Sequence, residues 1–328
     1  MSMPLLDSPK VLLDAAMNRG KKAAFEYPKQ KTVFYTVKGK EIAKVDVSGE
    51  YLEERLFKAA RVIPNINDLE PFYGDLYECI IDIDELRKNI SSMTSVARII
   101  KKLRRETIIR LKEMRFKPMG DKEAYEITKA YVGRVASVLR GLTKSIDYYN
   151  ESIKKLRELP SIKTNEECII LAGLPNVGKS TLLKKITTSK PEIAAYPFTT
   201  KGLNVGVFMQ RYLPIQVIDT PGLLDRPLRE RNNIELKAIT ALQHLKGIIC
   251  FVIDPAEDFE KQKSLFEEIK KLFTNHKFII VINKADIATQ PQIELIQKEF
   301  SGFEQVIDGN DRDTLKEFLI AKGRKLFA

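Results

Sequence analysis

One stretch of the sequence, Gly173-Leu-Pro-Asn-Val-Gly178-Lys179-Ser180, follows the pattern G-x-x-x-x-G-K-[ST]. The apolar run 168–172 before it predicts a buried strand, and residues 181–186 after it predict a helix. A loop of this pattern between a strand and a helix is typical of proteins that wrap the phosphates of a nucleotide. The stretch therefore predicts an α/β domain with a phosphate-binding loop.

Each residue type in this loop has a physical role in holding phosphate. The glycines let backbone N–H groups turn toward phosphate oxygens, and Lys179 places a positive charge near the β- and γ-phosphates. Ser180 offers a hydroxyl to Mg²⁺, and the helix that begins there adds the positive end of its dipole. The predicted phosphate site comprises Gly173, Leu174, Pro175, Asn176, Val177, Gly178, Lys179, Ser180 and Thr181.

A second motif, Asp219-Thr-Pro-Gly222, follows the predicted strand 215–218. A carboxylate at the end of a strand can hold Mg²⁺, so Asp219 joins Ser180 as a predicted metal ligand. Gly222 can bring its backbone N–H to the γ-phosphate because no Cβ stands in the way. Alone, D-x-x-G also describes a simple turn; after a phosphate loop it predicts a γ-phosphate contact.

A third motif, Asn283-Lys284-Ala285-Asp286, follows the predicted strand 278–282 and identifies the base. The carboxylate of Asp286 can accept hydrogen bonds from the N1–H and the amine of guanine. Adenine lacks this pair of donors, so the wrong base would leave a charge unpaired. The three motifs together predict a domain that binds GTP and GDP with Mg²⁺ and hydrolyses GTP.

A further segment, Tyr196-Pro-Phe-Thr199-Thr200, lies between the loop helix and the next predicted strand. A segment in this position orders around Mg²⁺ and the γ-phosphate and is released on hydrolysis. One threonine would complete the ligands of the metal; we predict Thr200, with Thr199 as the alternative. Lys179, Thr200 and Gly222 are therefore predicted catalytic residues.

The apolar pattern divides the chain into two predicted domains, residues 1–160 and residues 161–328. The second part alternates short apolar runs with helical segments, which predicts a mostly parallel sheet with helices on both faces. The first part has helical periodicity and predicts an α-helical bundle. The predicted strands are 168–172, 205–208, 215–218, 248–253, 278–282 and 303–307.

The strongest helical signal of the first part is a single apolar stripe from residue 122 to residue 156. Two more helices are predicted over 73–88 and 92–114. The runs 31–37 and 41–47 are rich in β-branched and aromatic residues, and they predict a hairpin or an extended arm.

The composition favours a globular protein with an anionic partner. The chain has 328 residues and a formal net charge of +11, and most of the basic excess lies in its first half. Such charge attracts nucleic acid or anionic lipid. No apolar run approaches the roughly 20 residues that span a bilayer, and the N-terminus lacks the pattern of a signal peptide. We expect a cytoplasmic protein without a membrane span that is a monomer when free.

The segment 98–117 is strongly basic. Its basic residues are Arg98, Lys101, Lys102, Arg104, Arg105, Arg110, Lys112, Arg115 and Lys117. Its apolar residues keep one side for the bundle, so much of the basic set can face outward. RNA phosphate fits such a face, recognised by shape and backbone; the alternative is a plain solvated surface. The lysines of 31–44 are a second candidate.

Longer stretches around these motifs resemble one family. Tyr196–Gly206 and Asp219–Leu228, with Pro175-Asn176 in the loop, are similar to the Obg group of GTPases. Glu230-Arg-Asn-Asn-Ile-Glu235 and Pro71-Phe-Tyr-Gly-Asp-Leu76 resemble its nucleolar GTP-binding protein 1 branch. The resemblance covers nearly the whole chain. Because eukaryotic members continue well past the GTPase domain, this chain resembles a short archaeal form.

The resemblance implies a nucleotide switch in biogenesis of the large ribosomal subunit, whose precursor and rRNA would be partners through residues 98–117. It places Leu223 where many small GTPases carry a water-orienting glutamine, which implies slow intrinsic hydrolysis. The asparagine matching Asn176 helps to hold K⁺ in related GTPases, so K⁺ is a candidate cofactor and Asn176 a further predicted catalytic residue. Asp308-Gly309 replaces the usual Ser-Ala of the last guanine-contacting loop, where Gly309 can still offer its N–H.

Other functions stay open at this point. One is a nucleotide-gated RNA-binding scaffold whose hydrolysis is incidental. Another is a GTPase of the membrane surface that uses the basic face on anionic lipid, and a third is a translation-linked GTPase of the Obg type. A Lys179→Ala variant that still supports subunit assembly would favour the scaffold. Comparing liposome flotation with rRNA binding separates the membrane-surface GTPase from the RNA-binding alternatives.

Overall fold

The computed structural model describes the chain in seven segments: residues 4–62, 69–159, 161–187, 192–194, 202–210, 213–308 and 314–322. The chain divides into two compact units, one of residues 1–66 with 81–157 and one of residues 67–80 with 158–328. The structure thus differs from a single boundary at residue 160, because a short segment of the first half belongs to the second unit. No helix in the described part of the chain is long and apolar enough to cross a membrane.

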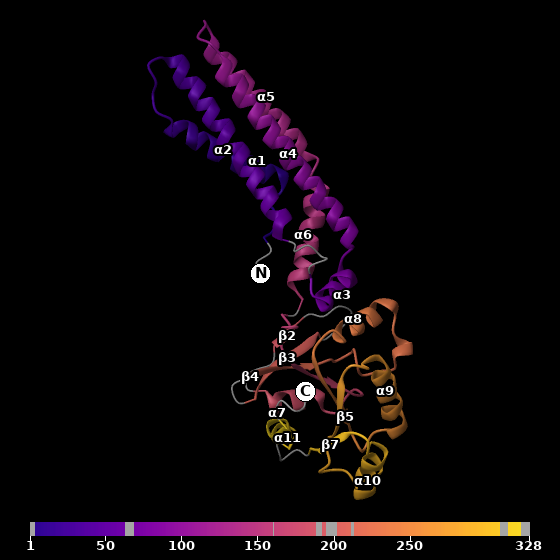
Figure 1. The fold of residues 1–328 in the computed structure, drawn as a ribbon. Coiled ribbons are helices and arrows are strands. Elements are labelled where there is room, and N and C mark those ends of the chain that lie inside the picture. The colour runs from indigo at the N-terminus through magenta and orange to yellow at the C-terminus, as the bar shows by residue number, and fades with distance from the viewer. Residues whose placement is uncertain are drawn as a thin grey trace. The chain divides into compact units, whose positions relative to one another are not determined.

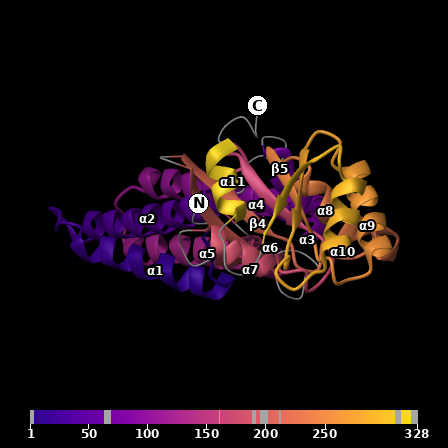
Figure 2. The same cartoon turned by 90° about the horizontal axis from the view of Figure 1, so that it is seen from below.

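The first unit is a bundle of long helices (Figure 1). Its elements are α1 (Pro9–Glu26), α2 (Val33–Val62), α4 (Ile83–Glu113), α5 (Gly120–Arg140) and α6 (Thr143–Arg157). Figure 2 shows α1, α2 and α5 side by side from a second direction, and α6 packs against α4. Each helix buries one apolar face, with Leu12, Leu56, Ile100 and Val135 fully enclosed. The predicted helical bundle is confirmed.

The hairpin or arm expected over 31–47 is wrong, because α2 runs through these residues. Val45, Leu52 and Leu56 are fully buried along one side of this helix. Packing of that side against the bundle outweighs the preference of valine, threonine and tyrosine for strands, since strand preference depends strongly on context. Gly20 lets α1 and α2 approach, as a Cβ there would lie 2.6 Å from the backbone carbonyl oxygen of Lys44.

The continuous helix expected over 122–156 is interrupted at Gly141–Leu142. The N–H of Gly141 donates to the carbonyl of Ser137 and ends α5, and the hydroxyl of Thr143 donates to the carbonyl of Arg140 over 2.9 Å. The predicted stripe is still buried on both sides of the break. A stripe with unbroken periodicity cannot reveal such an interruption.

The helices expected over 73–88 and 92–114 are divided at a different point. A short α3 (Pro71–Ile80) ends before Asp82, and the long α4 then begins. The carboxylate of Asp82 accepts the backbone N–H of Glu85 over 2.9 Å, as expected of an N-cap residue. This cap fixes where α4 starts. The helix then continues to Glu113 without the break that was expected after residue 88.

The second unit contains a seven-stranded sheet in the order β2-β3-β4-β1-β5-β6-β7. Its strands are β1 (Cys168–Ala172), β2 (Glu192–Ala194), β3 (Leu203–Gln210), β4 (Leu213–Asp219), β5 (Gly247–Ile253), β6 (Lys277–Ile282) and β7 (Glu304–Ile307). All pairs among β4, β1, β5, β6 and β7 are parallel, whereas β3 is antiparallel to both β2 and β4. The six predicted strands are confirmed, and among the strands of the described residues only the three-residue β2 was not predicted.

Helices cover both faces of this sheet. One apolar cluster joins the sheet to α3, α8 (Asn233–Leu242), α9 (Phe259–Leu272) and α10 (Gln290–Glu299), and the other joins it to α7 (Lys179–Ile186) and α11 (Thr314–Lys322). Along β1, Ile170 and Ala172 face the first cluster while Ile169 and Leu171 face the second. The predicted α/β layering is confirmed.

Residues 67–80 belong to the second unit because α3 packs there. Phe72 and Leu76 are fully buried in the first cluster of the sheet. The hydroxyl of Tyr73 donates to the carbonyl of Ile162 over 2.7 Å and accepts the N–H of the same residue over 2.9 Å. An ion pair between Glu78 and Lys237 joins α3 to α8, and a hydrogen bond between Asp75 and the ring of His244 joins it to the turn just after α8.

Candidate guanine-nucleotide site

The predicted phosphate loop lies between β1 and α7. Gly173 and Gly178 have φ of 137° and 99°, and Asn176 has φ of 65°. These are left-handed values, which glycine adopts readily. A Cβ at Gly178 would also lie 2.2 Å from the side-chain nitrogen of Asn283, and Val177 is fully buried beneath the loop. The shape of the loop therefore depends on its glycines.

Lys179 lies at the base of this loop and is 6% exposed. Its ammonium donates to the carbonyl oxygens of Gly173 and Leu174, both over 2.8 Å. Burial lowers the pKa of Lys179, and the carboxylates of Asp219 and Asp225 oppose that shift. The ammonium is thus held inside the loop by two neutral carbonyl oxygens, which phosphate oxygens can replace because they carry more charge.

The predicted metal ligands meet beside the loop. The hydroxyl of Ser180 donates to Oδ2 of Asp219 over 2.5 Å, and the side-chain amide of Asn204 donates to the same oxygen over 2.9 Å. Oδ1 of Asp219 is buried and has no hydrogen-bond partner within the described residues. A hydroxyl beside a carboxylate with an unused oxygen fits Mg²⁺, which prefers oxygen ligands. Ser180 and Asp219 would hold the ion, and Thr200 and Thr199 lie outside the described residues.

The predicted base-reading loop follows β6. The side-chain amide of Asn283 donates to the carbonyl of Val177 over 2.8 Å, which ties this loop to the phosphate loop. Lys284 has φ of 56°, and its ammonium donates to Oδ2 of Asp254 over 2.7 Å. Asp286 is exposed, so its carboxylate is accessible to a base. These contacts hold the phosphate loop and the base-reading loop at one edge of the sheet.

Asp308 follows β7 and closes the same edge. Its N–H donates to the carbonyl of Ile282 over 2.8 Å, and its carbonyl accepts the N–H of Ala285 over 3.2 Å. The carboxylate is 1% exposed, and its Oδ2 lies 3.6 Å from the ammonium of Lys185 on α7. The backbone of Asp308 thus supports the base-reading loop, while its charge is turned toward α7. Gly309 lies outside the described residues.

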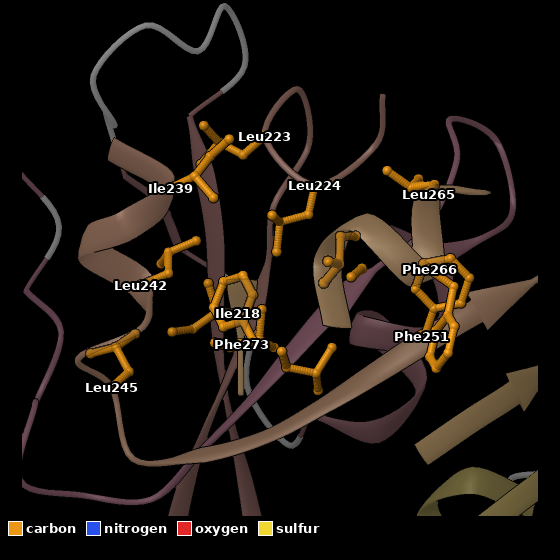
Figure 3. Packing of buried hydrophobic residues seen from close by; sticks show 14 of the residues in the cluster. Ile218, Leu223, Leu224, Ile239, Leu242, Leu245, Phe251, Leu265, Phe266 and Phe273 are labelled. Carbon is orange, nitrogen blue, oxygen red and sulfur yellow. The ribbon is translucent and has the colours of Figure 1, made fainter. Parts of the chain in front are cut away.

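The segment after Asp219 turns its apolar side chains inward. Leu223 and Leu224 are fully buried, and Figure 3 shows Leu223 beside Ile239 of α8. The carbonyl of Leu224 accepts the N–H of Gly173 over 3.0 Å, so this segment also contacts the phosphate loop. Leu223 therefore belongs to the core and presents no polar group to a nucleotide.

Several residues of the site have no signature in the sequence. Asn204 reaches Asp219 only because β3 and β4 pair with these two residues opposite each other. Asp254 follows the end of β5 and is 2% exposed. Its place directly after a predicted strand is a pattern in the sequence that indicates a residue of the site. Asp225 and Arg231 form a buried ion pair beside Gly222, with 3.2 Å between nitrogen and oxygen.

A cavity of about 630 Å³ opens elsewhere on the second unit, at the amino ends of β5, β6 and β7. Phe273, Phe278 and Phe303 line it, together with His276. None of the predicted nucleotide residues contributes to it. Because nucleotides bind at the carboxyl ends of strands in open α/β sheets, the loops described above, and not this cavity, form the candidate site.

A mostly parallel sheet that carries a phosphate loop, a D-x-x-G turn and an N-K-x-D loop at its carboxyl edge defines a P-loop GTPase. Residues 1–163 match the NOG1 N-terminal helical domain, and residues 168–284 match the 50S ribosome-binding GTPase family. The chain belongs to the nucleolar GTP-binding protein 1 family.

The chain is similar to several individual proteins. An uncharacterised protein of Methanocaldococcus jannaschii is 37% identical over 298 residues, which are 89% of this chain and 82% of that protein. Nucleolar GTP-binding protein 1 of Drosophila melanogaster is 37% identical over 252 residues, 75% of this chain but only 38% of that protein. A crystal structure of nucleolar GTP-binding protein 1 from Plasmodium falciparum is 33% identical with a TM-score of 0.44, covering 52% of this chain and 90% of that chain. This chain thus spans less than half the length of the Drosophila protein.

Proposed function

We propose that this protein is a GTP-hydrolysing switch in biogenesis of the large ribosomal subunit and that it contacts rRNA through its helical unit. The hydrogen bond from Asn283 to the carbonyl of Val177 carries the nucleotide part of the proposal, because it joins the base-reading loop to the phosphate loop. The words ribosome-binding and nucleolar in the names of the matching family and relatives support the ribosomal part.

The residues at the site support slow hydrolysis. Lys179 would exchange the carbonyl oxygens of its own loop for phosphate oxygens, and the loop N–H groups would stabilise the charge that develops on the departing phosphates. Mg²⁺, when bound by Ser180 and Asp219, would neutralise phosphate charge. The buried Leu223 cannot orient an attacking water. A fast rate would therefore need a group supplied from elsewhere, as activating partners supply in other GTPases.

The helical unit offers an exposed face of positive charge on α4. Arg98, Lys101, Arg105 and Lys112 recur at helical spacing and are exposed, and none of them forms an ion pair within the described residues. We term these four residues the α4 basic face. Some other members of the predicted basic set are engaged in ion pairs, such as Arg104, which pairs with Asp46 and Glu53, both over 2.9 Å.

Salt dependence tests the rRNA contact. Replacing the four residues of the α4 basic face with alanine should weaken binding to a large-subunit rRNA fragment and make the slope of log affinity against log salt shallower by about three, because each lost phosphate contact removes about 0.7–0.9 from the slope. The matched control replaces Arg134, Arg140, Lys144 and Lys154, which are exposed in the same unit. Equal losses in both variants would show general charge attraction and contradict a specific face.

The ribosomal role is tested by sedimentation. Extract from the native organism, supplied with either GDP or a non-hydrolysable GTP analogue, is separated on a sucrose gradient. We expect the protein to migrate with large-subunit precursors only with the triphosphate. Migration independent of nucleotide would favour an RNA-binding scaffold with incidental hydrolysis. Flotation with anionic liposomes at salt concentrations that abolish rRNA binding would favour a GTPase of the membrane surface.

A further inference from the structure

The turn that contains Gly222 is closed by a pair of charged side chains. The N–H of Gly222 donates to Oδ2 of Asp225 over 2.7 Å. The guanidinium of Arg231 donates to the carbonyls of Gly222 and Leu223, the latter over 2.6 Å, and to Oδ1 of Asp225 over 3.2 Å. We term Asp225 and Arg231 the latch. One carboxylate and one guanidinium thereby bind both polar backbone groups of the D-x-x-G glycine.

The latch is built into the fold and is not a surface ion pair. The side chain of Arg231 is fully buried, and that of Asp225 is 14% exposed. A buried ion pair loses its hydration and remains only where its hydrogen bonds are well made, and removal of one partner leaves a buried charge without compensation. The position of Arg231 is fixed from the other side by α8. Asn232 and Glu235 there each accept the backbone N–H of the other, over 2.8 and 3.0 Å.

The latch occupies a donor that a nucleotide also needs. In the D-x-x-G turn the glycine N–H is the group that meets the γ-phosphate, and GDP has no γ-phosphate. Oδ2 of Asp225 accepts this same N–H, and an N–H makes one strong hydrogen bond at a time. A carboxylate at this place would in addition repel an incoming γ-phosphate. GDP can therefore bind with the latch closed, whereas GTP must displace Asp225.

We propose that the latch sets the preference between GDP and GTP: Asp225 competes with the γ-phosphate for the N–H of Gly222, and Arg231 holds Asp225 in the competing position. The inference rests on the proposed nucleotide switch and identifies residues that set its resting state. When Asp225 is displaced, Arg231 keeps its hydrogen bonds to the two carbonyls and holds the turn for the γ-phosphate. The carboxylate thus acts as an internal substitute for the phosphate group that GDP lacks.

Nucleotide affinities of the full chain test this proposal. Fluorescent derivatives of GDP and of a non-hydrolysable GTP analogue are titrated at fixed Mg²⁺. We expect Asp225→Ala to raise the ratio of triphosphate to diphosphate affinity about tenfold, equivalent to about 1.4 kcal/mol. Asp225→Asn, which keeps an acceptor and removes the charge, should give a smaller rise in the same direction. Retention of GDP affinity shows that both variants are folded.

The matched control is Arg229→Ala, which removes an exposed arginine of the same segment. Its affinity ratio should stay within twofold of wild type. An unchanged ratio in both Asp225 variants, or an equal loss of affinity for both nucleotides, overturns the latch. If the wild-type protein binds neither nucleotide, the proposed function itself fails; if it binds both and the ratio does not move, only the latch fails.

Discussion

Two charged residues of the candidate site are buried and can still bind a ligand. The ammonium of Lys179 rests on two carbonyls of its own loop, and Asp219 has an unused oxygen beside Ser180. Both groups are removed from water, so their interactions with a phosphate or a metal are stronger than at the surface. Each also has a hydrogen-bond partner within the protein that a ligand atom can replace. Nucleotide binding at such a site exchanges one set of polar contacts for a better one.

Lys179→Ala should lower the rate of GTP hydrolysis by at least about a hundredfold, the usual effect of losing a group that stabilises transition-state charge. The rate is measured as phosphate release with saturating GTP. Lys184→Ala is the control, because Lys184 is exposed on the same helix. Hydrolysis within tenfold of wild type in the Lys179 variant would remove this residue from the reaction.

Asn176 is exposed in the phosphate loop, in a left-handed conformation with φ of 65°. If it helps to hold K⁺, hydrolysis should be several-fold faster in potassium than in sodium chloride of equal concentration, because a second cation offsets developing phosphate charge. Asn176→Ala should abolish that difference and leave the rate in sodium unchanged. Equal wild-type rates in the two salts would contradict a role for K⁺.

His276 links stability to pH. Burial lowers its pKa below the ordinary 6.5, against a hydrogen bond of its ring to the carbonyl of Leu245. The unfolded chain therefore binds the proton more readily, and stability is lost as the pH falls below 6.5. His276→Asn should lose less stability between pH 7.5 and pH 5.5 in urea unfolding. The same loss in the variant and in wild type would show that other groups govern this range.

Among the elements, α3 packs in a different unit from the helices next to it in the chain. It follows α2 of the helical unit in the chain, yet Phe72 and Leu76 complete the core beside the sheet. Its charged side chains pair with Lys237 and His244, at α8 and just after it. Because α8 begins next to Arg231, α3 supports the helix that positions the latch.

Phe72→Ala should destabilise the GTPase unit by about 3–5 kcal/mol, as expected for removal of a large buried aromatic side chain. Hydrogen exchange should become faster in β1 and α8, and remain unchanged in α5. Leu56→Ala is the opposite control, because Leu56 is fully buried in the helical unit. Faster exchange in α5 with the Phe72 variant would show that α3 belongs energetically to the bundle.

At the scale of the whole molecule, the exposed basic residues of α4 and the candidate nucleotide site lie in different units. The sheet unit contains the predicted nucleotide residues that the structure describes, whereas the α4 basic face lies in the helical unit. A ligand that binds only the folded sheet unit should stabilise that unit by mass action. This separation allows the proposed nucleotide binding and the proposed RNA binding to be measured independently.

GDP with Mg²⁺ at about one hundred times its dissociation constant should stabilise the sheet unit by about 2.7 kcal/mol. Hydrogen exchange should slow in β1, α7 and β6 and stay unchanged in α2 and α5. An rRNA fragment should give the reverse pattern, with protection in α4. Protection of α2 and α5 by GDP to the same degree as β1 would contradict independent units.

Local patterns of the chain predicted the class of this protein and the residues of its candidate site. A phosphate loop is a continuous stretch, and its glycines, lysine and serine act on one ligand through neighbouring backbone groups. The same holds for Asp219-Thr-Pro-Gly222 and Asn283-Lys284-Ala285-Asp286. Their order along the chain, each after an apolar run, was sufficient to predict the parallel sheet and the edge at which they meet.

Only the tertiary structure decided the features that depend on residues far apart in the chain. Residues 33–47 are helical because of what they pack against, and α3 joins the sheet because Phe72 and Leu76 are buried there. Asn204 reaches Asp219 through the register of two paired strands. Register and packing are set by the burial of whole faces, and no single stretch of sequence contains both partners of such a contact.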